Sequence, residues 1–259
     1  MPKIQILYWS DFICPFCYIA EQRMKNLMKE LNIMDKFGFK LLSFELDPNA
    51  PRERKLNIVE NFAKKYYMPV EQARQTVEHI NQLGKAEGID FKYDTCRGGN
   101  TFKAHRLTKY VEKKGNYENT EKIINLLYDA YFTKNLLISD ENVLIDLGIK
   151  VGCTKEELEK FLASDDLSKE VRQDEEDGYS EGVHGVPYFI INKEVINGAA
   201  PKEEMKEVLL RALKKNNGEK KNDGHPEGVV CDETGCYFKN KWKGILLFVI
   251  YYKIFIKNI

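Results

Sequence analysis

The sequence has no net charge: its 259 residues include 40 Lys or Arg and 40 Asp or Glu residues. This balance gives no general attraction to nucleic acid or to an anionic membrane surface, so neither is an expected partner. The first residues, MPKIQ, also lack the long apolar run and the small-residue cleavage site of a secretory signal. We therefore expect a cytoplasmic protein.

Cysteine is scarce, with six residues in the chain, which is too few for a disulfide scaffold. In a reducing compartment, paired cysteines are more often catalytic or metal-binding than structural. The hydrophobic content of 43% is ample for a core, and the length suits one large domain or two small ones.

Patterns along the chain predict an α/β protein with a long helical insertion. Alternation and β-forming residues predict strands, and apolar residues at helical spacing predict helices. The expected order is strand 3–9, a helix from Pro15 to about Leu31, strand 39–46, helices only within 51–182, a hairpin of 186–191 and 194–196, and a last helix from Pro201 to Leu213.

These elements predict three parts. Residues 1–50 and 183–215 form one discontinuous α/β domain, and residues 51–182 form a helical domain inserted into it. Residues 216–259 form a polar linker and a tail that carries a second cysteine pair. The apolar run 245–252 in this tail is far shorter than the roughly 20 residues of a membrane span, so we expect an added strand or an extension there rather than an interfacial anchor.

The stretch SDFICPFCYIA, residues 10–20, carries the main chemical signal. Cys14 falls where the first strand has ended and the first helix begins, and a helix N-terminus favours a thiolate over a thiol. A thiolate is the nucleophile of disulfide exchange. Cys17 lies one turn further on, where it can attack a mixed disulfide formed at Cys14, and Pro15 suits the first turn of a helix.

Two other interpretations of this C-x-x-C motif remain open. The pair could be two idle thiols, or half of a zinc site. A zinc-binding module would use Cys14 and Cys17 together with Cys231 and Cys236 from the tail. Cys96 and Cys153 have no partner at motif spacing, and we expect buried or free thiols there.

Four stretches together resemble the DsbA-like thioredoxin-fold oxidoreductases, in particular their cytoplasmic FrnE-type branch. They are SDFICPFCYIA, GNTFKAHRLTKY at 99–110, GVHGVPYFIINKEVINGA at 182–199, and the cysteine pair in the tail. They span most of the chain. The resemblance implies a thioredoxin fold with a large helical insertion between its two halves.

The resemblance also implies roles for individual residues. Val186-Pro187 would be a cis-proline loop that faces the cysteines, and the main chain of Val186 would pair with a bound polypeptide or glutathione. An ordinary trans proline at an edge strand is the alternative for Pro187. Cys231 and Cys236 would be a second redox pair that recycles the first.

Phe16 departs from the family pattern, because the strongest oxidants of the family carry a histidine at this position. A phenyl ring gives no charge or hydrogen bond to the Cys14 thiolate, so we expect a weaker oxidant, a reductase or an isomerase. Pro15, Phe16 and Val186 are candidate substrate-binding residues. His105 is another, since the corresponding helix of glutathione-using relatives lines the cleft; a structural histidine is equally compatible with the sequence.

We expect a thiol–disulfide oxidoreductase or isomerase that acts on protein or small-molecule disulfides without a cofactor. Cys14 attacks, Cys17 resolves, and Pro187 helps to orient the substrate. The main alternative is a glutathione-dependent enzyme of the kappa-class transferase or 2-hydroxychromene-2-carboxylate isomerase type. Such relatives typically carry a serine where Cys14 stands, so the intact motif argues against them.

Overall fold

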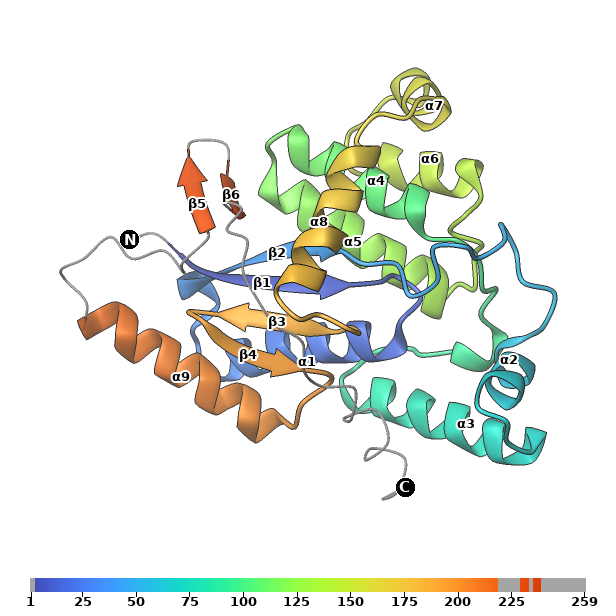
Figure 1. Ribbon diagram of the computed structural model, residues 1–259, viewed down its shortest axis with the longest axis horizontal. Coiled ribbons are helices and arrows are strands. Elements are labelled where there is room, and N and C mark those ends of the chain that lie inside the picture. Colours follow the sequence, from blue (N-terminus) through green and yellow to red (C-terminus); the bar gives the residue numbers. More distant parts are fainter. Residues whose placement is uncertain (1–2, 219–228, 233–234, 239–259) are drawn as a thin grey trace. The chain divides into compact units, whose positions relative to one another are not determined.

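The computed structural model of the chain describes residues 3–218, 229–232 and 235–238 (Figure 1). The described residues fall into two units, 3–218 and the short hairpin within 229–238. The larger unit is built on a four-stranded mixed sheet of order β2-β1-β3-β4. Its strands are β1 (Ile4–Ser10), β2 (Phe37–Ser43), β3 (Tyr188–Ile191) and β4 (Glu194–Asn197). β1 and β2 are parallel, and the other two pairings are antiparallel.

Helix α1 joins β1 to β2, a set of helices separates β2 from β3, and α9 follows β4. The helices are α1 (Pro15–Glu30), α2 (Ile58–Lys65), α3 (Val70–Ala86), α4 (Phe102–Lys113), α5 (Tyr117–Phe132), α6 (Glu141–Ile149), α7 (Lys155–Ala163), α8 (Ser168–Ser180) and α9 (Lys202–Gly218). Two short 3₁₀ turns, Met34–Lys36 and Tyr93–Thr95, lie between them. This is the element order that the sequence predicts.

β1 is buried on both faces, and its alternation directs neighbouring side chains to opposite layers. The Tyr8 hydroxyl donates a hydrogen bond to Glu21 of α1 (3.0 Å). The Trp9 indole donates to the main-chain oxygen of Asp174 in α8 (2.7 Å) on the other face. A Cβ at Gly178 would lie only 2.7 Å from the Trp9 ring nitrogen. Helix α8 therefore approaches the sheet at Gly178, the position at which the helix carries no side chain. The central strand is thus held between two helices.

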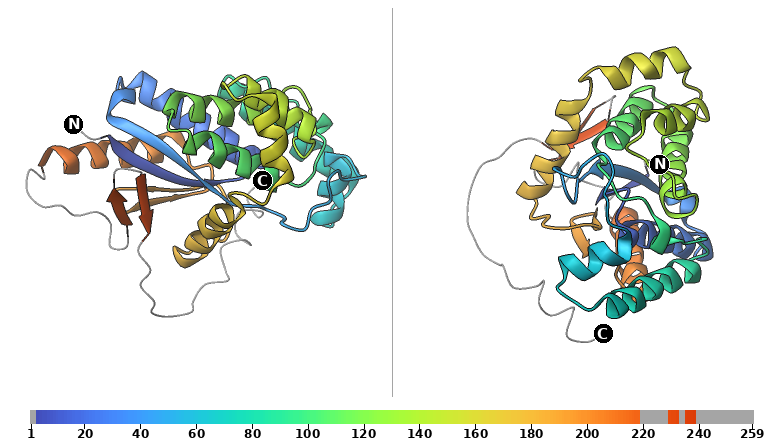
Figure 2. Two further views of the ribbon diagram at one scale, coloured as in Figure 1. Left: turned by 90° about the horizontal axis from the view of Figure 1, so that it is seen from above. Right: turned by 90° about the vertical axis from the view of Figure 1, so that its right-hand side faces the viewer.

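The insertion forms two groups of helices, α2 with α3 and α4 with α5 to α7 (Figures 1 and 2). Both join one continuous core with α1. Aromatic rings fill the region between them: Phe91 stacks on Phe132 (4.6 Å between centroids), and Tyr18 of α1 stacks on Tyr128 of α5 (4.6 Å). These helices fall within the range 51–182 assigned to the insertion, and its folding as a domain of its own stays a prediction.

Several element boundaries differ from the expected ones. β2 begins at Phe37 rather than at residue 39, and β3 begins at Tyr188 rather than at residue 186. Ser10 is the last residue of β1 rather than a strand breaker, because it pairs with Ser43. β2 ends at Ser43, before Leu46. Helix α9 continues to Gly218, so the first residues of the expected linker are helical. The hairpin turn at Asn192-Lys193 is confirmed; both residues have positive φ, as a tight hairpin turn requires.

The smaller unit is a two-stranded hairpin of β5 (Val229–Asp232) and β6 (Gly235–Phe238), in which Cys231 lies opposite Cys236. The apolar run 245–252 lies outside the described residues. Among the helices that the structure describes, none is both long enough and apolar enough to cross a membrane.

Candidate active site

Cys14 is the N-cap residue of α1, directly after the turn that follows β1. Its backbone is extended (φ −84°, ψ 112°), and its amide donates to the Asp11 carbonyl (3.0 Å). Pro15 occupies the first helical position, where the lack of an N–H costs no hydrogen bond. No side chain caps this end of the helix, which leaves the Cys14 sulfur beside the positive end of the helix dipole.

The Cys14 sulfur faces the loop that precedes β3. Its Sγ lies 3.5 Å from the main-chain oxygen of Val186, and the peptide bond between Val186 and Pro187 is cis. β3 begins at the next residue, Tyr188, which pairs with Trp9 of β1. The antiparallel pairing of β1 and β3 therefore carries Val186 to the start of α1. The expected cis-proline loop is present and faces the first cysteine.

Cys17 lies one turn into α1 with only 1% of its surface exposed. Burial and the adjacent Cys14 sulfur, to which its thiol hydrogen-bonds, raise the pKa of Cys17 well above its usual value. The neighbouring polar groups of the Ser10 side chain and the Asp11 main chain act in the opposite direction and lower the pKa of Cys17. Both cysteines are free thiols in the structure. Cys17 is held as a thiol directly beneath Cys14.

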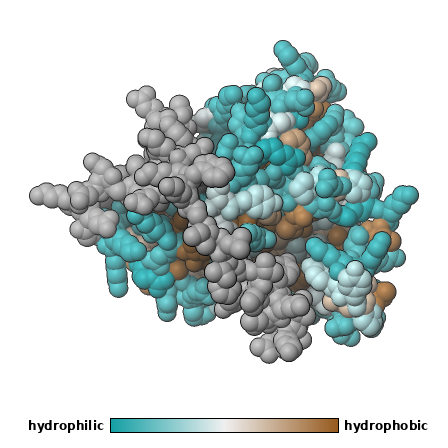
Figure 3. Space-filling view, viewed as in Figure 1, coloured by the Kyte–Doolittle hydropathy of each residue, from teal (hydrophilic) through white to brown (hydrophobic). Residues whose placement is uncertain are grey.

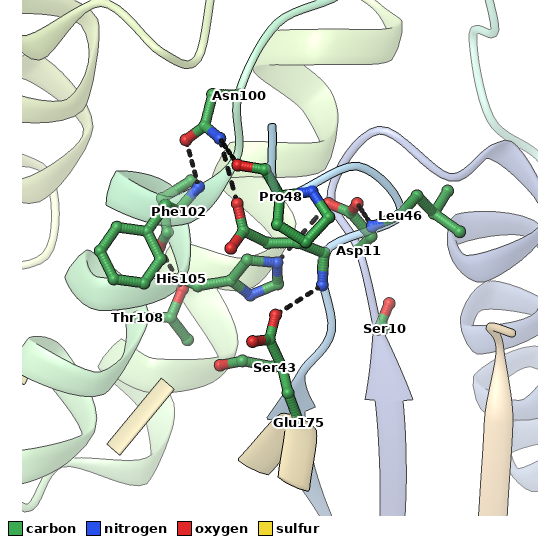
Figure 4. A network of polar contacts seen from close by, with 12 residues as sticks. Ser10, Asp11, Ser43, Leu46, Pro48, Asn100, Phe102, His105, Thr108 and Glu175 are labelled. Atoms are coloured by element: carbon green, nitrogen blue, oxygen red, sulfur yellow. Dashed lines mark hydrogen bonds and ion pairs between the residues drawn. The ribbon is translucent and has the colours of Figure 1, made fainter. Parts of the chain in front are cut away.

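Asp11 ties the turn before Cys14 to its surroundings (Figure 4). Its Oδ2 accepts a hydrogen bond from the amide of Leu46 (2.8 Å), just beyond β2. Its Oδ1 lies 3.5 Å from Nε2 of His105 in α4, and both side chains are fully buried. One aspartate thus connects the cysteine turn, the end of β2 and the insertion.

The stretch GNTFKAHR places the start of α4 against this turn (Figure 4). The main chain at Gly99 passes so close to Arg52 that only glycine fits there: a Cβ would lie 2.2 Å from the main-chain oxygen of Arg52. The Asn100 side chain donates to Glu45 Oε1 (3.1 Å) and accepts from the amide of Phe102 (2.9 Å). The motif therefore acts as an anchor between the insertion and the sheet.

His105, Arg106 and His184 have different surroundings. His105 is completely buried against the ring of Phe12 (4.9 Å between centroids), so it lies inside the protein and not on a cleft wall. Arg106 donates to three main-chain oxygens at the end of α7 and in the segment that follows it, those of Phe161 (3.2 Å), Ser164 (2.6 Å) and Asp166 (2.8 Å). His184 is exposed in the loop before Val186.

Apolar residues reach the surface on one largely hydrophilic face of the molecule (Figure 3). Phe16, between the two cysteines, has 37% of its surface exposed, and Leu46, joined to Asp11 through its amide, has 42% exposed. Pro15 is buried and Val186 is half-buried. Phe16 is therefore the residue of the motif most accessible to a partner.

The remaining cysteines divide into two groups. Cys96 and Cys153 are buried free thiols, as expected. Cys96 Sγ donates to the Tyr131 carbonyl (3.1 Å), and burial raises the pKa of the Cys96 thiol strongly. Cys231 and Cys236 are cross-strand partners in the backbone register, and their side chains lie outside the description. The second redox pair and the zinc alternative therefore stay predictions.

Three polar residues next to the cysteines were missed in the sequence: Ser10, Asp11 and Tyr128. Ser10 and Asp11 stand beside the motif, but a polar pair at the end of a strand is typical of a turn. Tyr128 is 118 positions from Ser10, and its hydroxyl nevertheless lies 2.5 Å from Ser10 Oγ. A helical apolar pattern predicts the burial of Tyr128 and gives no indication of where its hydroxyl points.

Comparisons with known proteins agree with this geometry. The sequence model of the family described as "DSBA-like thioredoxin domain" matches residues 5–210. Among curated proteins, the uncharacterized protein YwbO of Bacillus subtilis (strain 168) is 23% identical over 217 residues, which cover 82% of this chain and 98% of YwbO. The fold class predicted from the sequence, a thioredoxin fold with a large helical insertion, is confirmed.

Two solved structures are also similar. A probable DsbA oxidoreductase from Streptomyces coelicolor superposes with a TM-score of 0.77 and 26% identity, covering 92% of this chain and 100% of that one. The cytosolic disulfide reductase DsbM from Pseudomonas aeruginosa, solved with GSH (glutathione), gives a TM-score of 0.53 at 14% identity, covering 82% and 100%. The second likeness is one of fold alone.

Proposed function

The chain belongs to the family of DSBA-like thioredoxin domains, and from this premise we propose that it exchanges disulfides with protein or low-molecular-weight thiols through Cys14 and Cys17. The observation that supports this most directly is the asymmetry of the pair. Both cysteines are buried, but Cys14 stands at the helix N-terminus and faces the Val186 carbonyl, whereas Cys17 lies one turn into α1 and is retained as a thiol by its raised pKa.

In the reducing direction, the Cys14 thiolate attacks one sulfur of a substrate disulfide. A Cys14–substrate disulfide forms, and the other substrate sulfur leaves as a thiolate with the bonding electron pair. Cys17 then loses its proton and attacks Cys14 Sγ, which releases the second substrate thiolate. The products are a Cys14–Cys17 disulfide and two reduced substrate sulfurs. The same steps in reverse oxidise a dithiol.

The loop before β3 supports a role for Val186 and Pro187 in substrate binding. A bound extended segment can pair with main-chain groups beside Cys14, in the manner of strand addition. The exposed Phe16 offers an apolar contact next to the reacting sulfur. Glutathione is a reasonable small substrate, since DsbM, which has the same fold, was solved with GSH.

We favour a reductase or isomerase role in a reducing, cytoplasmic compartment over a strongly oxidising one. Phe16 carries no charge or hydrogen-bond donor that would stabilise the Cys14 thiolate and so make the disulfide a stronger oxidant. The thiol at position 14 also favours disulfide exchange over glutathione-dependent isomerisation, in which a serine is expected there. The placement of this chain in the FrnE-type branch belongs to the same proposal.

The experiment is insulin reduction in a glutathione buffer by the wild-type chain and by Cys14→Ser, Cys17→Ser and Cys96→Ser. We expect activity to be lost in Cys14→Ser, strongly reduced in Cys17→Ser, and unchanged in Cys96→Ser, whose thiol is buried and donates to the Tyr131 carbonyl. Equal rates for Cys14→Ser and the wild type would refute the proposal.

A further inference from the structure

His105 is a fully buried histidine of α4, and its ring faces the turn that precedes Cys14 (Figure 4). Its Nε2 lies 3.5 Å from Asp11 Oδ1, and its ring packs against Phe12, the next residue of the turn (4.9 Å between centroids). The amide of Cys14 closes this turn on the Asp11 carbonyl (3.0 Å). One side chain of the insertion therefore contacts the first two residues of the turn that ends at Cys14.

The two oxygens of the Asp11 carboxylate have different neighbours. Oδ2 accepts a hydrogen bond from the Leu46 amide (2.8 Å), whereas Oδ1 is buried and meets the His105 ring. Among the ion pairs of the described residues, His105 is the basic side chain that Asp11 contacts. A buried charge is costly unless it is paired and hydrogen-bonded. The imidazole is therefore the group that offsets the charge on this side of Asp11.

The geometry also indicates which nitrogen of His105 carries a proton. A carboxylate can only accept a hydrogen bond, so the nitrogen that faces Asp11, Nε2, has to be a donor. The other ring nitrogen, Nδ1, is buried and has no hydrogen-bond partner among the described residues. Because the partners of the two nitrogens decide which of them is protonated, an N–H at Nε2 is directed at Asp11.

The charged groups around this contact have partners of their own. Glu45, just beyond β2, and Glu175 of α8 share Arg172 (2.6 and 2.7 Å). Asp174 of α8 pairs with Lys109 of α4 (2.5 Å). Both of these cations are engaged by other carboxylates, so neither replaces His105 at Asp11.

The state of Asp11 matters for Cys14 because the two residues are close. They are the first and fourth residues of a hydrogen-bonded turn, so their Cα atoms lie within about 7 Å of each other. A negative charge at this range disfavours a second one, here the Cys14 thiolate. A donor that offsets the Asp11 charge therefore favours the thiolate that attacks a disulfide. It also holds the turn that places the Cys14 sulfur beside Val186.

We propose that His105 is a positioning residue for disulfide exchange: its Nε2–H fixes the Asp11 carboxylate, offsets its charge, and so sets the reactivity of Cys14. This proposal rests on the disulfide exchange proposed above. His105 acts through Asp11 and is not a catalytic residue. The imidazole transfers no proton, and the bonds that form and break are those of the exchange itself.

The test follows the attack by Cys14 alone, with 5,5′-dithiobis(2-nitrobenzoate) as the disulfide. The reference is the full chain with Cys17→Ser, Cys231→Ser and Cys236→Ser, in which Cys14 is the remaining thiol of the two pairs. Its thiolate attacks one sulfur of the reagent, and the other sulfur leaves with the electron pair as coloured thionitrobenzoate. Stopped-flow absorbance at pH 7 gives the rate, and peptide mapping confirms the modified residue.

Three variants of the reference separate the donor from the space that it fills. His105→Leu removes the donor and keeps a side chain of similar size. His105→Gln returns an uncharged N–H close to the position of Nε2. Asp11→Asn combined with His105→Leu removes the charge together with its donor.

Lys109→Leu is the matched control. Lys109 lies one turn after His105 in α4, and its Nζ is 2.5 Å from Oδ2 of Asp174, which also accepts from the Ser43 amide (2.7 Å). Loss of the lysine leaves a carboxylate with one main-chain donor, just as loss of the histidine leaves Asp11. Asp174 lies in α8, outside the cysteine turn. Urea titrations show whether both leucine variants are folded under the assay conditions.

We expect His105→Leu to slow the attack by Cys14 roughly threefold to tenfold, because the Asp11 charge is no longer offset. His105→Gln and the double variant should both stay within about twofold of the reference, the first because a donor is present and the second because the charge is gone. Lys109→Leu should also stay within about twofold, since its carboxylate is not part of the turn.

A second measurement needs no change at the site itself. The full chain has four histidines, and the other three, His79, His184 and His225, are replaced by glutamine. The ¹⁵N signals of the remaining imidazole then show which nitrogen of His105 is protonated at pH 7. We expect a proton on Nε2. A bare Nε2 would overturn the proposal even if His105→Leu does not fold.

Equal rates for His105→Leu and Lys109→Leu would overturn the proposal while leaving the proposed function intact. A double variant or His105→Gln as slow as His105→Leu would also overturn it, because lost packing and not the Asp11 charge would then explain the result. If the reference chain releases no thionitrobenzoate at Cys14, the proposed function itself fails.

Discussion

The sulfur of Cys14 lies 3.5 Å from the main-chain oxygen of Val186, although the two residues are 172 positions apart in the chain. The contact arises because β1 ends at the cysteine turn and β3 begins after the cis peptide bond, and the two strands pair side by side. It places a main-chain acceptor next to the thiol that we assign as the nucleophile. The candidate active site is therefore made by the two halves of the sheet, on either side of the insertion.

We predict that Cys17→Ser traps a mixed disulfide at Cys14. The serine hydroxyl cannot attack a disulfide under these conditions, so the adduct formed by Cys14 is not resolved. Incubation with oxidised glutathione followed by intact-mass measurement should give a chain carrying one glutathione, located at Cys14 by peptide mapping. The same treatment of Cys14→Ser should give far less adduct at Cys17, because its raised pKa keeps it a thiol and its exposed fraction is 1% against 4% for Cys14. A preference for Cys17 would reverse the two roles.

Phe16→His should make the Cys14–Cys17 disulfide a stronger oxidant. Phe16 is partly exposed, so the imidazole can be accommodated without a change in the core. A positive or hydrogen-bonding group beside Cys14 stabilises the thiolate of the reduced form. We expect the midpoint potential to rise by roughly 30 mV or more, which corresponds to about 1.4 kcal/mol for a two-electron couple. Phe16→Leu, which adds no donor, is the control; a rise of the same size in Phe16→Leu would contradict this explanation.

Gly99→Ala should destabilise the protein by about 1–3 kcal/mol, because overpacking forces the backbone to shift. The added Cβ would lie 2.2 Å from the main-chain oxygen of Arg52. Gly185→Ala is a matched control, since a Cβ there meets nothing within 4 Å. The free energies of unfolding come from urea titrations of both variants. Equal free energies of unfolding for the two variants would show that the backbone near Gly99 shifts to accommodate the Cβ without loss of stability.

The free energy of unfolding should fall as the pH rises above about 10, where tyrosines of the unfolded chain ionise. Burial raises the pKa values of Tyr8, Tyr93, Tyr128 and Tyr131 well above that value. In this range the unfolded chain releases protons that the folded chain retains, so ionisation favours unfolding.

Each such tyrosine contributes a slope of about −1.4 kcal/mol per pH unit. Urea titrations between pH 8 and pH 11 measure the total slope, and Tyr131→Phe should make it shallower by the share of one tyrosine. A slope that is identical in Tyr131→Phe would mean that this hydroxyl ionises in the folded protein as it does in the unfolded chain.

The scaffold and the cysteine pair could be predicted from the sequence. Alternating apolar residues predicted β1, Pro15 and the helical spacing after it predicted α1, and the turn residues Asn192 and Lys193 predicted the hairpin. These are local patterns, and local backbone preference agrees with the final structure at each of them.

The polar surroundings of the cysteines could not be predicted in this way. The positions of Tyr128 and His105 depend on how the insertion packs on α1, which no local pattern specifies. For His105 the sequence left a cleft-lining and a structural histidine equally open, and the structure packs it in the interior against Phe12. The end of α9 was also missed, because the Lys- and Asn-rich segment after Leu213 resembles a linker in composition.

The most direct test of the central claim is a glutathione redox titration of the full chain with Cys231→Ser and Cys236→Ser. Free thiols are alkylated at each ratio of reduced to oxidised glutathione and assigned by mass spectrometry. We predict that Cys14 and Cys17 lose their reactivity together, in a single two-electron transition, while Cys96 and Cys153 do not change. Disulfide exchange through this pair would be contradicted if both of its thiols remained free in excess oxidised glutathione, or if Cys14 carried glutathione without ever forming a disulfide to Cys17.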